Sequence, residues 1–265
     1  MSEIQFATVL EGAQPFSENN VNSTFRGSVL TSGGDTKLAI IKDLNLVQLC
    51  NELIASCLAV EFGLPVPQAM LGMVEPGVLD VHLAPQLPNK ARLVFVSLDV
   101  KVPNLSYKIT SSSAEVQSIV MEKVCNWEKI GDLYAYDTWI ANIDRHAGNL
   151  LFGEPDEVWL IDHGHSFTGP CWNLTDLIPH TAYENRLSEW LTGRLTTTQK
   201  KAGASGVREF SNKVIDYDAN AVMKNSRVAQ ILSGNASSAL KQFLEQRVQY
   251  VLKHASAALG VPVLV

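Results

Sequence analysis

The stretch NIDRHAGNLLFGEPDEVWLIDHGHSF, from Asn142 to Phe167, decides how this chain folds. Two short apolar runs, LLF and VWLI, flank the segment GEPDE, whose Gly, Pro and Asp are typical of tight turns. The pattern therefore predicts a β-hairpin. Around the two runs the stretch gathers three Asp, three His and two Asn, and this polar set needs a chemical explanation.

A hairpin brings the residues at its open ends side by side. Neighbouring strands lie about 5 Å apart, and the residues at these ends are Asn149 and Asp162. One oxygen from each suits a hard cation such as Mg²⁺, which takes a few protein oxygens together with phosphate and water. Asp144 lies on the loop that enters the first strand, where a carboxylate can accept a hydroxyl proton. The spacing D-x4-N-x12-D thus fits phosphoryl transfer.

The motif DRHAGNLLF followed by LIDHGHSF resembles the catalytic and metal-binding loops of the HipA-like kinases. It is also similar to the phosphatidylinositol 3/4-kinase pattern of DRH, Asn and Asp-x-Gly, and aminoglycoside-type phosphotransferases share a looser form of the same spacing. The preceding segment DLYAYDTWIANI fits the helix that delivers this loop in those families. The resemblance extends over roughly residues 36–167.

The resemblance implies an α+β, two-lobed protein-kinase-like fold. The sequence changes from β-rich to mainly helical near residue 100, so we expect a nucleotide-binding N-lobe over residues 1–100 and a larger helical C-lobe over residues 101–265. The C-lobe carries the catalytic and metal-binding loops. The implied cofactors are ATP and Mg²⁺, with Asp144 as the catalytic residue and with Asn149 and Asp162 on the metal.

Residues of the N-lobe complete the implied site. Lys42 ends the predicted strand LAIIK, and in the kinases that the chain resembles such a lysine binds the nucleotide phosphates while an acid on the next helix positions it. Glu52 is the candidate acid, and it lies roughly 60–80° off the apolar stripe of its helix, facing either a cleft or water. The backbone of VFVSLDV, at Val96 and Leu98, is the candidate for holding the adenine.

The phosphate-binding loop departs from the kinase pattern. No G-x-G-x-x-G occurs before Lys42. Instead the stretch SENNVNSTFRG would cradle the phosphates with backbone N–H groups and the side chain of Asn22, Ser23 or Thr24. His146 is expected to hydrogen-bond within the catalytic loop, and contact with phosphate is a second role open to it.

Periodicity predicts further elements. Alternating patterns indicate strands at residues 4–10, 25–32 and 37–44, which suggest a small antiparallel sheet, and at 92–100. Apolar residues at helical spacing predict helices over residues 46–62 and 237–259. The Gly, Ser and Ala cluster at residues 202–206 suggests a loop between C-terminal helices.

Composition bounds the partners and the compartment. The 265 residues are 46% hydrophobic with a net charge of −6, and neither a Lys/Arg block nor an acidic tail occurs, so no nucleic-acid partner and no membrane contact are predicted. No apolar run approaches the ~20 residues of a membrane span. The four cysteines form no CxxC pair and the N-terminus lacks a signal pattern, which predicts a cytoplasmic protein. No extra subdomain like that of full-length HipA toxins is expected, so toxin function is not implied.

Several functions remain open on the sequence. A HipA-like serine/threonine kinase acting on a protein substrate ranks first, ahead of a phosphoinositide or small-molecule kinase, because the sequence after Phe167 carries little basic charge. The intact Asp/Asn/Asp set disfavours a nucleotide-binding pseudokinase. Outside the kinases, His146, His163 and His165 with Cys171 suggest a zinc hydrolase, which needs three protein ligands and an open position. The sequence identifies neither the acceptor nor the oligomeric state.

Overall fold

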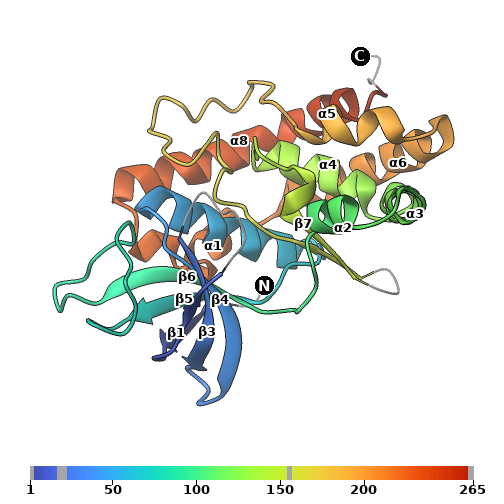
Figure 1. Cartoon of the computed structure of the whole chain (residues 1–265). Coiled ribbons are helices and arrows are strands. Elements are labelled where there is room, and N and C mark those ends of the chain that lie inside the picture. Colours follow the sequence, from blue (N-terminus) through green and yellow to red (C-terminus); the bar gives the residue numbers. More distant parts are fainter. Residues whose placement is uncertain (1–2, 17–22, 154–156, 262–265) are drawn as a thin grey trace.

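The computed structural model describes residues 3–16, 23–153 and 157–261 of the chain. In this part the first hundred residues are mainly strands and the rest mainly helices (Figure 1). The first region holds β1 (Gln5–Val9), β2 (Gln14–Pro15), β3 (Thr24–Thr31), β4 (Thr36–Lys42), α1 (Leu46–Glu61), β5 (Ala69–Val74) and β6 (Arg92–Leu98). The second holds α2 (Leu105–Ser111), α3 (Ala114–Cys125), α4 (Ile130–Trp139), β7 (Leu150–Gly153), β8 (Glu157–Leu160), α5 (Leu187–Trp190), α6 (Thr197–Lys213), α7 (Ala219–Asn225) and α8 (Gly234–Ala258), with 3-10 turns η1 (Ala147–Asn149), η2 (Thr192–Arg194), η3 (Val214–Asp216) and η4 (Val228–Gln230).

The N-terminal strands form a sheet in the order β1-β5-β6-β4-β3-β2, and β1 also pairs with β3, so the sheet closes on itself. Strands β1, β3 and β4 pair antiparallel, as the sequence predicted. Strand β5, which was not predicted from the sequence, pairs in parallel with β1. A parallel pair needs a long crossover connection, and the chain from β3 through α1 supplies it.

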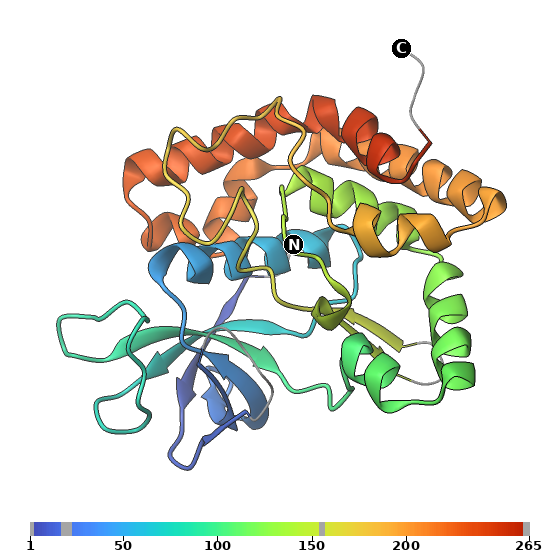
Figure 2. The ribbon, with the colours of Figure 1, turned by 45° about the horizontal axis from the view of Figure 1, so that its top comes forward.

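Two hydrophobic cores use the two faces of this sheet. Successive residues of a strand point to opposite faces, so Met70 lies in a core enclosed by the closed sheet while Leu71 faces α1 and the C-terminal helices. The enclosed core also contains Val29 and Ile41 from β3 and β4. The larger core joins α1 to the helices of the second region, which places α1 between the sheet and those helices (Figure 2).

Helix α1 confirms the predicted helix and is more deeply buried than its pattern suggested. Asn45 caps its N-terminus, because the Asn45 side chain accepts a hydrogen bond from the Gln48 backbone N–H at 2.9 Å. Every residue from Gln48 to Ala59 is buried, since the helix is covered on one side by the sheet and on the other by the C-terminal helices. Glu52 therefore faces the interior and not water.

The prediction of a loop at residues 202–206 is wrong, because α6 runs through this segment without a break. The glycines there serve helix packing. A Cβ atom on Gly131 of α4 would overlap the carbonyl oxygen of Gly203, and one on Gly206 would meet the Cα of Gly131 at 3.2 Å. Glycine thus lets α4 and α6 approach closely, and the same residues that resemble a chain break permit the contact.

The long C-terminal helix is confirmed as α8, which begins after the N-cap residue Ser233 and packs against α4 and α6. Its apolar residues Leu240, Phe243, Leu244 and Val251 are buried, in agreement with the stripe read from the sequence. Within the described ranges, none of the helices combines the length and the apolar character required to cross a membrane.

Candidate active site

The hairpin predicted from the opening stretch is present as β7 and β8, which pair antiparallel with Leu150 opposite Leu160. The pairing extends beyond the strands, because the Ile161 backbone N–H donates to the Asn149 carbonyl oxygen at 3.1 Å. Asn149 and Asp162 therefore lie at the open end of the hairpin, as expected. Asp162 adopts a left-handed backbone conformation with φ of 62°, which turns the chain as it leaves β8.

A buried arginine fixes this open end. Arg145 donates from Nη1 to the carbonyl oxygens of Asn149, at 3.1 Å, and Ile161, at 2.6 Å, so it ties the two strand ends together. Its Nε and Nη2 donate to the carboxylate of Asp137 on α4, at 2.9 and 3.1 Å. Both members of this ion pair are fully buried. The pair joins α4 to the hairpin and sets the path of the loop that carries Asp144.

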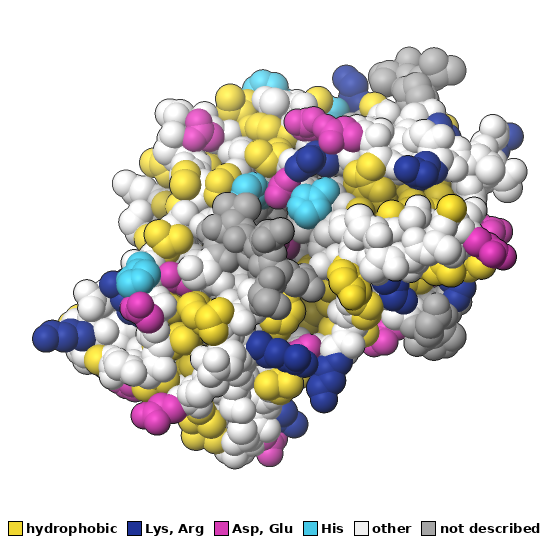
Figure 3. Space-filling model, viewed as in Figure 1, with side chains coloured by type: hydrophobic (Ala, Val, Ile, Leu, Met, Phe, Trp, Pro, Cys, Tyr) yellow, Lys and Arg dark blue, Asp and Glu magenta, His cyan; other side chains and the backbone are white. Residues whose placement is uncertain are grey.

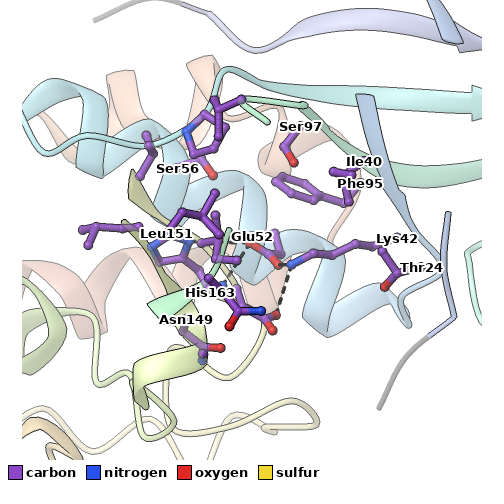
Figure 4. Close-up of a pocket in the computed structure, with 18 of the residues that line it drawn as sticks. Thr24, Ile40, Lys42, Glu52, Ser56, Phe95, Ser97, Asn149, Leu151 and His163 are labelled. Atoms are coloured by element: carbon purple, nitrogen blue, oxygen red, sulfur yellow. Dashed lines mark hydrogen bonds and ion pairs between the residues drawn. The ribbon is translucent and has the colours of Figure 1, made fainter. Parts of the chain in front are cut away.

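A cavity of about 380 Å³ lies between the sheet, α1 and the hairpin. Its polar wall contains the five charged or amide side chains that the sequence singled out, namely Lys42, Glu52, Asp144, Asn149 and Asp162. Figure 4 shows Lys42 reaching from β4 across the cavity toward Glu52 on α1, with Asn149 below them on the hairpin side. The structure therefore brings together side chains from both regions of the chain.

Lys42 bridges two carboxylates. Its Nζ lies 2.6 Å from Oε1 of Glu52 and 3.1 Å from Oδ1 of Asp162. Burial alone lowers the pKa of Lys42, but the charges of Asp162 and Glu52 outweigh it and hold this pKa above its ordinary value. Burial raises the pKa of Glu52, and Lys42 together with a hydrogen bond involving His163 more than compensates, so that this pKa is lowered. The ammonium is therefore charged and fixed in direction at neutral pH.

Asn149 and Asp162 offer the oxygen atoms that a hard cation needs. The amide nitrogen of Asn149 donates to the Asp144 carbonyl oxygen at 2.7 Å, which orients the amide so that its oxygen is the atom able to bind a cation. The Asp162 side chain is half exposed and lines the cavity. Amide and carboxylate oxygens are ligands of Mg²⁺, which also keeps several waters or phosphate oxygens. The donor set therefore fits this ion.

Asp144 lies at the mouth of the cavity, with its carboxylate partly exposed. One carboxylate oxygen, Oδ1, accepts a hydrogen bond from Nη1 of Arg186. The other, Oδ2, lies 3.8 Å from Nδ1 of His165. The backbone N–H of Asp144 donates to the side chain of Asn142 at 3.1 Å, so the loop as well as the side chain is held.

Comparison with known families settles the relationship of this chain. The sequence model of the family described as HipA-like kinase matches residues 22–216, which is most of the chain. The chain belongs to the HipA-like kinase family. Membership implies a kinase, that is a phosphotransferase, and kinases use ATP, usually with Mg²⁺. No curated protein matches this sequence significantly.

Two histidines of this HipA-like kinase, His146 and His163, make contacts around the candidate site. His146 confirms its expected hydrogen bond within the catalytic loop, because its Nδ1 accepts from the Gly148 backbone N–H at 3.0 Å, and it also lines the cavity. His163 is buried behind Glu52, and burial together with the charge of Arg145 lowers its pKa. Among the described residues no group of three or more His, Cys, Asp or Glu is arranged to hold a metal, so the zinc-site alternative finds no support.

The adenine-binding prediction needs a correction at Val96. Val96 is fully buried in the sheet, where it pairs with Ile41 on one side and Met70 on the other. Sheet pairing occupies a central strand on both edges, so its backbone is not available to a base. Leu98 does line the cavity, but its N–H donates to Gln68. Asp99 and Val100, just after β6 ends, also line the cavity.

The phosphate-loop prediction falls partly outside the described residues, which exclude 17–22 and hence Asn22. Thr24, at the start of β3, is nearly buried and lines the cavity of the HipA-like kinase. Ser23 is exposed, and its carbonyl oxygen accepts a hydrogen bond from the Asp43 backbone N–H at 2.9 Å. Of the two described residues, Thr24 is thus the one placed beside Lys42 (Figure 4).

Sequence reasoning missed the residues that hold the segment after the hairpin. Asn51 on α1 donates to the carbonyl oxygens of Gly164, Ser166 and Gly169 at 2.8 to 3.1 Å. Arg247 on α8 is buried and donates to three further carbonyl oxygens, those of Thr138, Pro179 and Thr181, each at 2.8 Å. A polar residue inside an otherwise apolar helical stripe was the available signal, and both Asn51 and Arg247 show it.

Proposed function

We propose that this chain is an ATP-dependent serine/threonine protein kinase, which transfers the γ-phosphate of Mg-ATP to a hydroxyl group of a protein substrate. The proposal includes a two-lobed protein-kinase-like fold, with a nucleotide-binding N-lobe over residues 1–100 and a catalytic C-lobe over residues 101–265. The observation that carries it is one cavity lined by Lys42, Asp144, Asn149 and Asp162, although Lys42 and Asp162 lie 120 residues apart in the sequence.

The nucleotide end of the site follows from the contacts of Lys42. Its charged ammonium, held by Glu52, binds the nucleotide phosphates, and Thr24 on β3 lies beside the backbone of Lys42. Asn149 and Asp162 would hold Mg²⁺ through their side-chain oxygens. Such an ion, when bound, would supply charge neutralisation at the phosphate oxygens. His146 and residues 98–100 line the remaining nucleotide surface.

Asp144 acts at the acceptor end. Its carboxylate accepts the proton of the acceptor hydroxyl while the hydroxyl oxygen bonds to the γ-phosphorus, and the bond from that phosphorus to the bridging oxygen of ADP breaks. Asp137 and Arg145 contribute by keeping the loop in place, since both are buried beneath it. Positioning of this kind provides much of the rate enhancement in phosphoryl transfer.

A protein acceptor is favoured over a lipid on charge. On the face shown in Figure 3, Lys and Arg side chains lie scattered among acidic ones and form no broad basic surface. A kinase of anionic lipids is expected to present such a surface. Cys50, Cys57, Cys125 and Cys171 are all free thiols, which supports a location in the reducing cytoplasm.

Transfer of labelled γ-phosphate from ATP to a generic protein substrate, or to the chain itself, tests the proposal. Phosphoserine or phosphothreonine detected by mass spectrometry is the expected product, and Asp144→Asn and Asp162→Asn are expected to reduce its rate of formation by at least about 100-fold. Asp216→Asn, an exposed change of the same type away from the cavity, is the matched control. Full activity in both site variants would overturn the mechanism.

Two further measurements separate the alternatives left open by the sequence. A thermal-shift titration with ATP and Mg²⁺ is expected to stabilise the protein, since any ligand that binds only the folded state does so. Binding without transfer to any acceptor would contradict the enzymatic proposal and indicate a pseudokinase. Transfer to phosphoinositide vesicles or small alcohols, but not to proteins, would contradict the protein-kinase assignment. The proposed mechanism of phosphoryl transfer would still hold.

A further inference from the structure

Arg186 contacts Asp144, which lines the cavity, and the chain on both sides of Arg186 is held in place. The preceding residue, Asn185, is buried and donates to the Tyr134 carbonyl oxygen at 3.2 Å and to the Thr138 hydroxyl at 3.1 Å. The following helix, α5, is anchored because Trp190 donates from Nε1 to the Arg145 carbonyl oxygen at 3.0 Å. The backbone at Arg186 is therefore fixed relative to the loop that carries Asp144.

The two oxygens of Asp144 have different surroundings. Oδ1 accepts the hydrogen bond from Nη1 of Arg186, while Oδ2 lies 3.8 Å from the His165 ring. The Arg186 guanidinium is itself oriented by Glu189, whose carboxylate lies 3.4 Å from Nε. We infer that Arg186 is a positioning residue for phosphoryl transfer, holding Oδ1 of Asp144 so that Oδ2 receives the proton of the acceptor hydroxyl.

Stability does not account for this contact. The side chains of Asp144 and Arg186 are 28% and 36% exposed, and ion pairs of that exposure contribute little to folding. A carboxylate that must meet a hydroxyl is sensitive to orientation, because a misplacement of about 1 Å in a reacting group costs about 100-fold in rate. The guanidinium suits this purpose, since its planar fork of N–H donors fixes the direction of each hydrogen bond.

Two substitutions test the inference, which rests on the proposed role of Asp144. Arg186→Gln is expected to lower kcat about 100-fold, with KM for ATP and the calorimetric affinity for Mg-ATP changed less than twofold. Arg186→Lys, which retains the charge, is expected to restore part of the rate. Arg208→Gln removes the same charge from the exposed face of α6 and is the control for folding and net charge. An unchanged kcat in Arg186→Gln, or a higher one, would overturn the inference.

A double-mutant cycle asks whether Arg186 acts through Asp144. If it does, the variant carrying both Asp144→Asn and Arg186→Gln is no slower than Asp144→Asn alone, because residues that act as a unit are not additive. A further 100-fold loss in the double variant would contradict the inference. If the wild-type chain itself transfers no phosphate, the proposed function fails, and that outcome is distinct from an active enzyme indifferent to Arg186.

Discussion

Two neighbouring residues of the loop before the hairpin, Asp144 and Arg145, each form an Arg–Asp pair, and the two pairs differ in burial. Arg145 meets Asp137 where both side chains are fully buried, while Asp144 meets Arg186 where both are partly exposed. The first pair also satisfies the backbone carbonyls of Asn149 and Ile161. The second leaves a carboxylate accessible from the cavity mouth.

The difference in burial between the two pairs distinguishes a residue that holds the loop in place from one that can act on a substrate. A buried ion pair is costly to break, because removing one partner leaves an uncompensated charge in the interior. An exposed pair contributes little to stability, since water and salt screen it. Burial therefore assigns Arg145 to the framework, and it leaves the partly exposed Asp144 free for a chemical role.

Breaking the buried pair gives the largest expected effect. Arg145→Ala leaves the Asp137 carboxylate unpaired in the interior and is expected to reduce the free energy of unfolding by about 3–5 kcal/mol. Phosphoryl transfer is lost with it, because the open end of the hairpin is no longer tied. Urea denaturation followed by circular dichroism measures the change, with Arg208→Ala as the exposed control. A loss of unfolding free energy below about 1 kcal/mol is typical of surface ion pairs. Such a result would show that the buried and the exposed pair contribute equally little to stability.

Removing the charge of Asp144 is expected to lower activity strongly and to change stability little, unlike Arg145→Ala. Asp144→Asn should lower kcat by about 10²–10⁴-fold, the range for a lost general base. The free energy of unfolding changes by less than about 1 kcal/mol, because the pair with Arg186 is partly exposed. Transfer assays and urea denaturation of the same preparation check both statements. Destabilisation as large as that of Arg145→Ala would show that Asp144 belongs to the framework.

The pair of Lys42 and Glu52 adds a pH dependence. The folded-state pKa of Glu52 is lowered from 4.5 to about 2, so its contribution to stability is present above about pH 4.5 and is lost as the pH falls toward 2. Glu52→Gln is expected to reduce the free energy of unfolding by about 2 kcal/mol at pH 7. This is somewhat less than the loss expected when a fully buried ion pair is broken. The difference in unfolding free energy from wild type should narrow as the pH falls through this window. A gap that stays constant from pH 7 to pH 3 would contradict this.

The smallest effect is expected at the sheet surface. Arg26 on β3 meets Asp99 at 2.5 Å, with the arginine side chain 45% exposed. Arg26→Ala should reduce the free energy of unfolding by less than about 1 kcal/mol. The Arg26–Asp99 distance is as short as that of the buried Arg145–Asp137 pair, but Arg26 is exposed to water, which screens the interaction. Thermal unfolding at low and high salt checks it. A loss above about 2 kcal/mol would mean that the distance between the charged groups, and not their burial, determines how much each ion pair contributes to stability.

The parts of the site that are local in sequence could be predicted. Asp144, Asn149 and Asp162 lie on one hairpin and its entry loop, so turn chemistry and strand spacing place them together. Lys42 was found because the resemblance to kinases implies a lysine on a strand before the first helix, and Lys42 ends the predicted strand LAIIK. Their roles stay predictions, but their positions around one cavity are as expected.

The parts that depend on distant contacts could not be predicted. Arg186 lies 42 residues beyond Asp144 in a segment without periodicity, and no local pattern ties the two together. Val96 was misassigned because an alternating pattern identifies a strand and not which of its edges is free. The break expected at residues 202–206 failed for a similar reason, since Gly203 and Gly206 are explained by the approach of α4 and not by their own segment.

The burial of α1 limits how this protein can be switched. Kinases are commonly regulated by movement of the helix that carries the acid paired with the lysine. Here that movement would carry Leu49, Leu53 and Leu58, together with their apolar neighbours, out of the larger core. At ~1.5–3 kcal/mol for each large side chain, the cost is on the order of 10 kcal/mol, comparable to the whole stability of a typical domain. Control of this chain by movement of α1 is therefore energetically costly, because the helix behind Lys42 is held by the larger core.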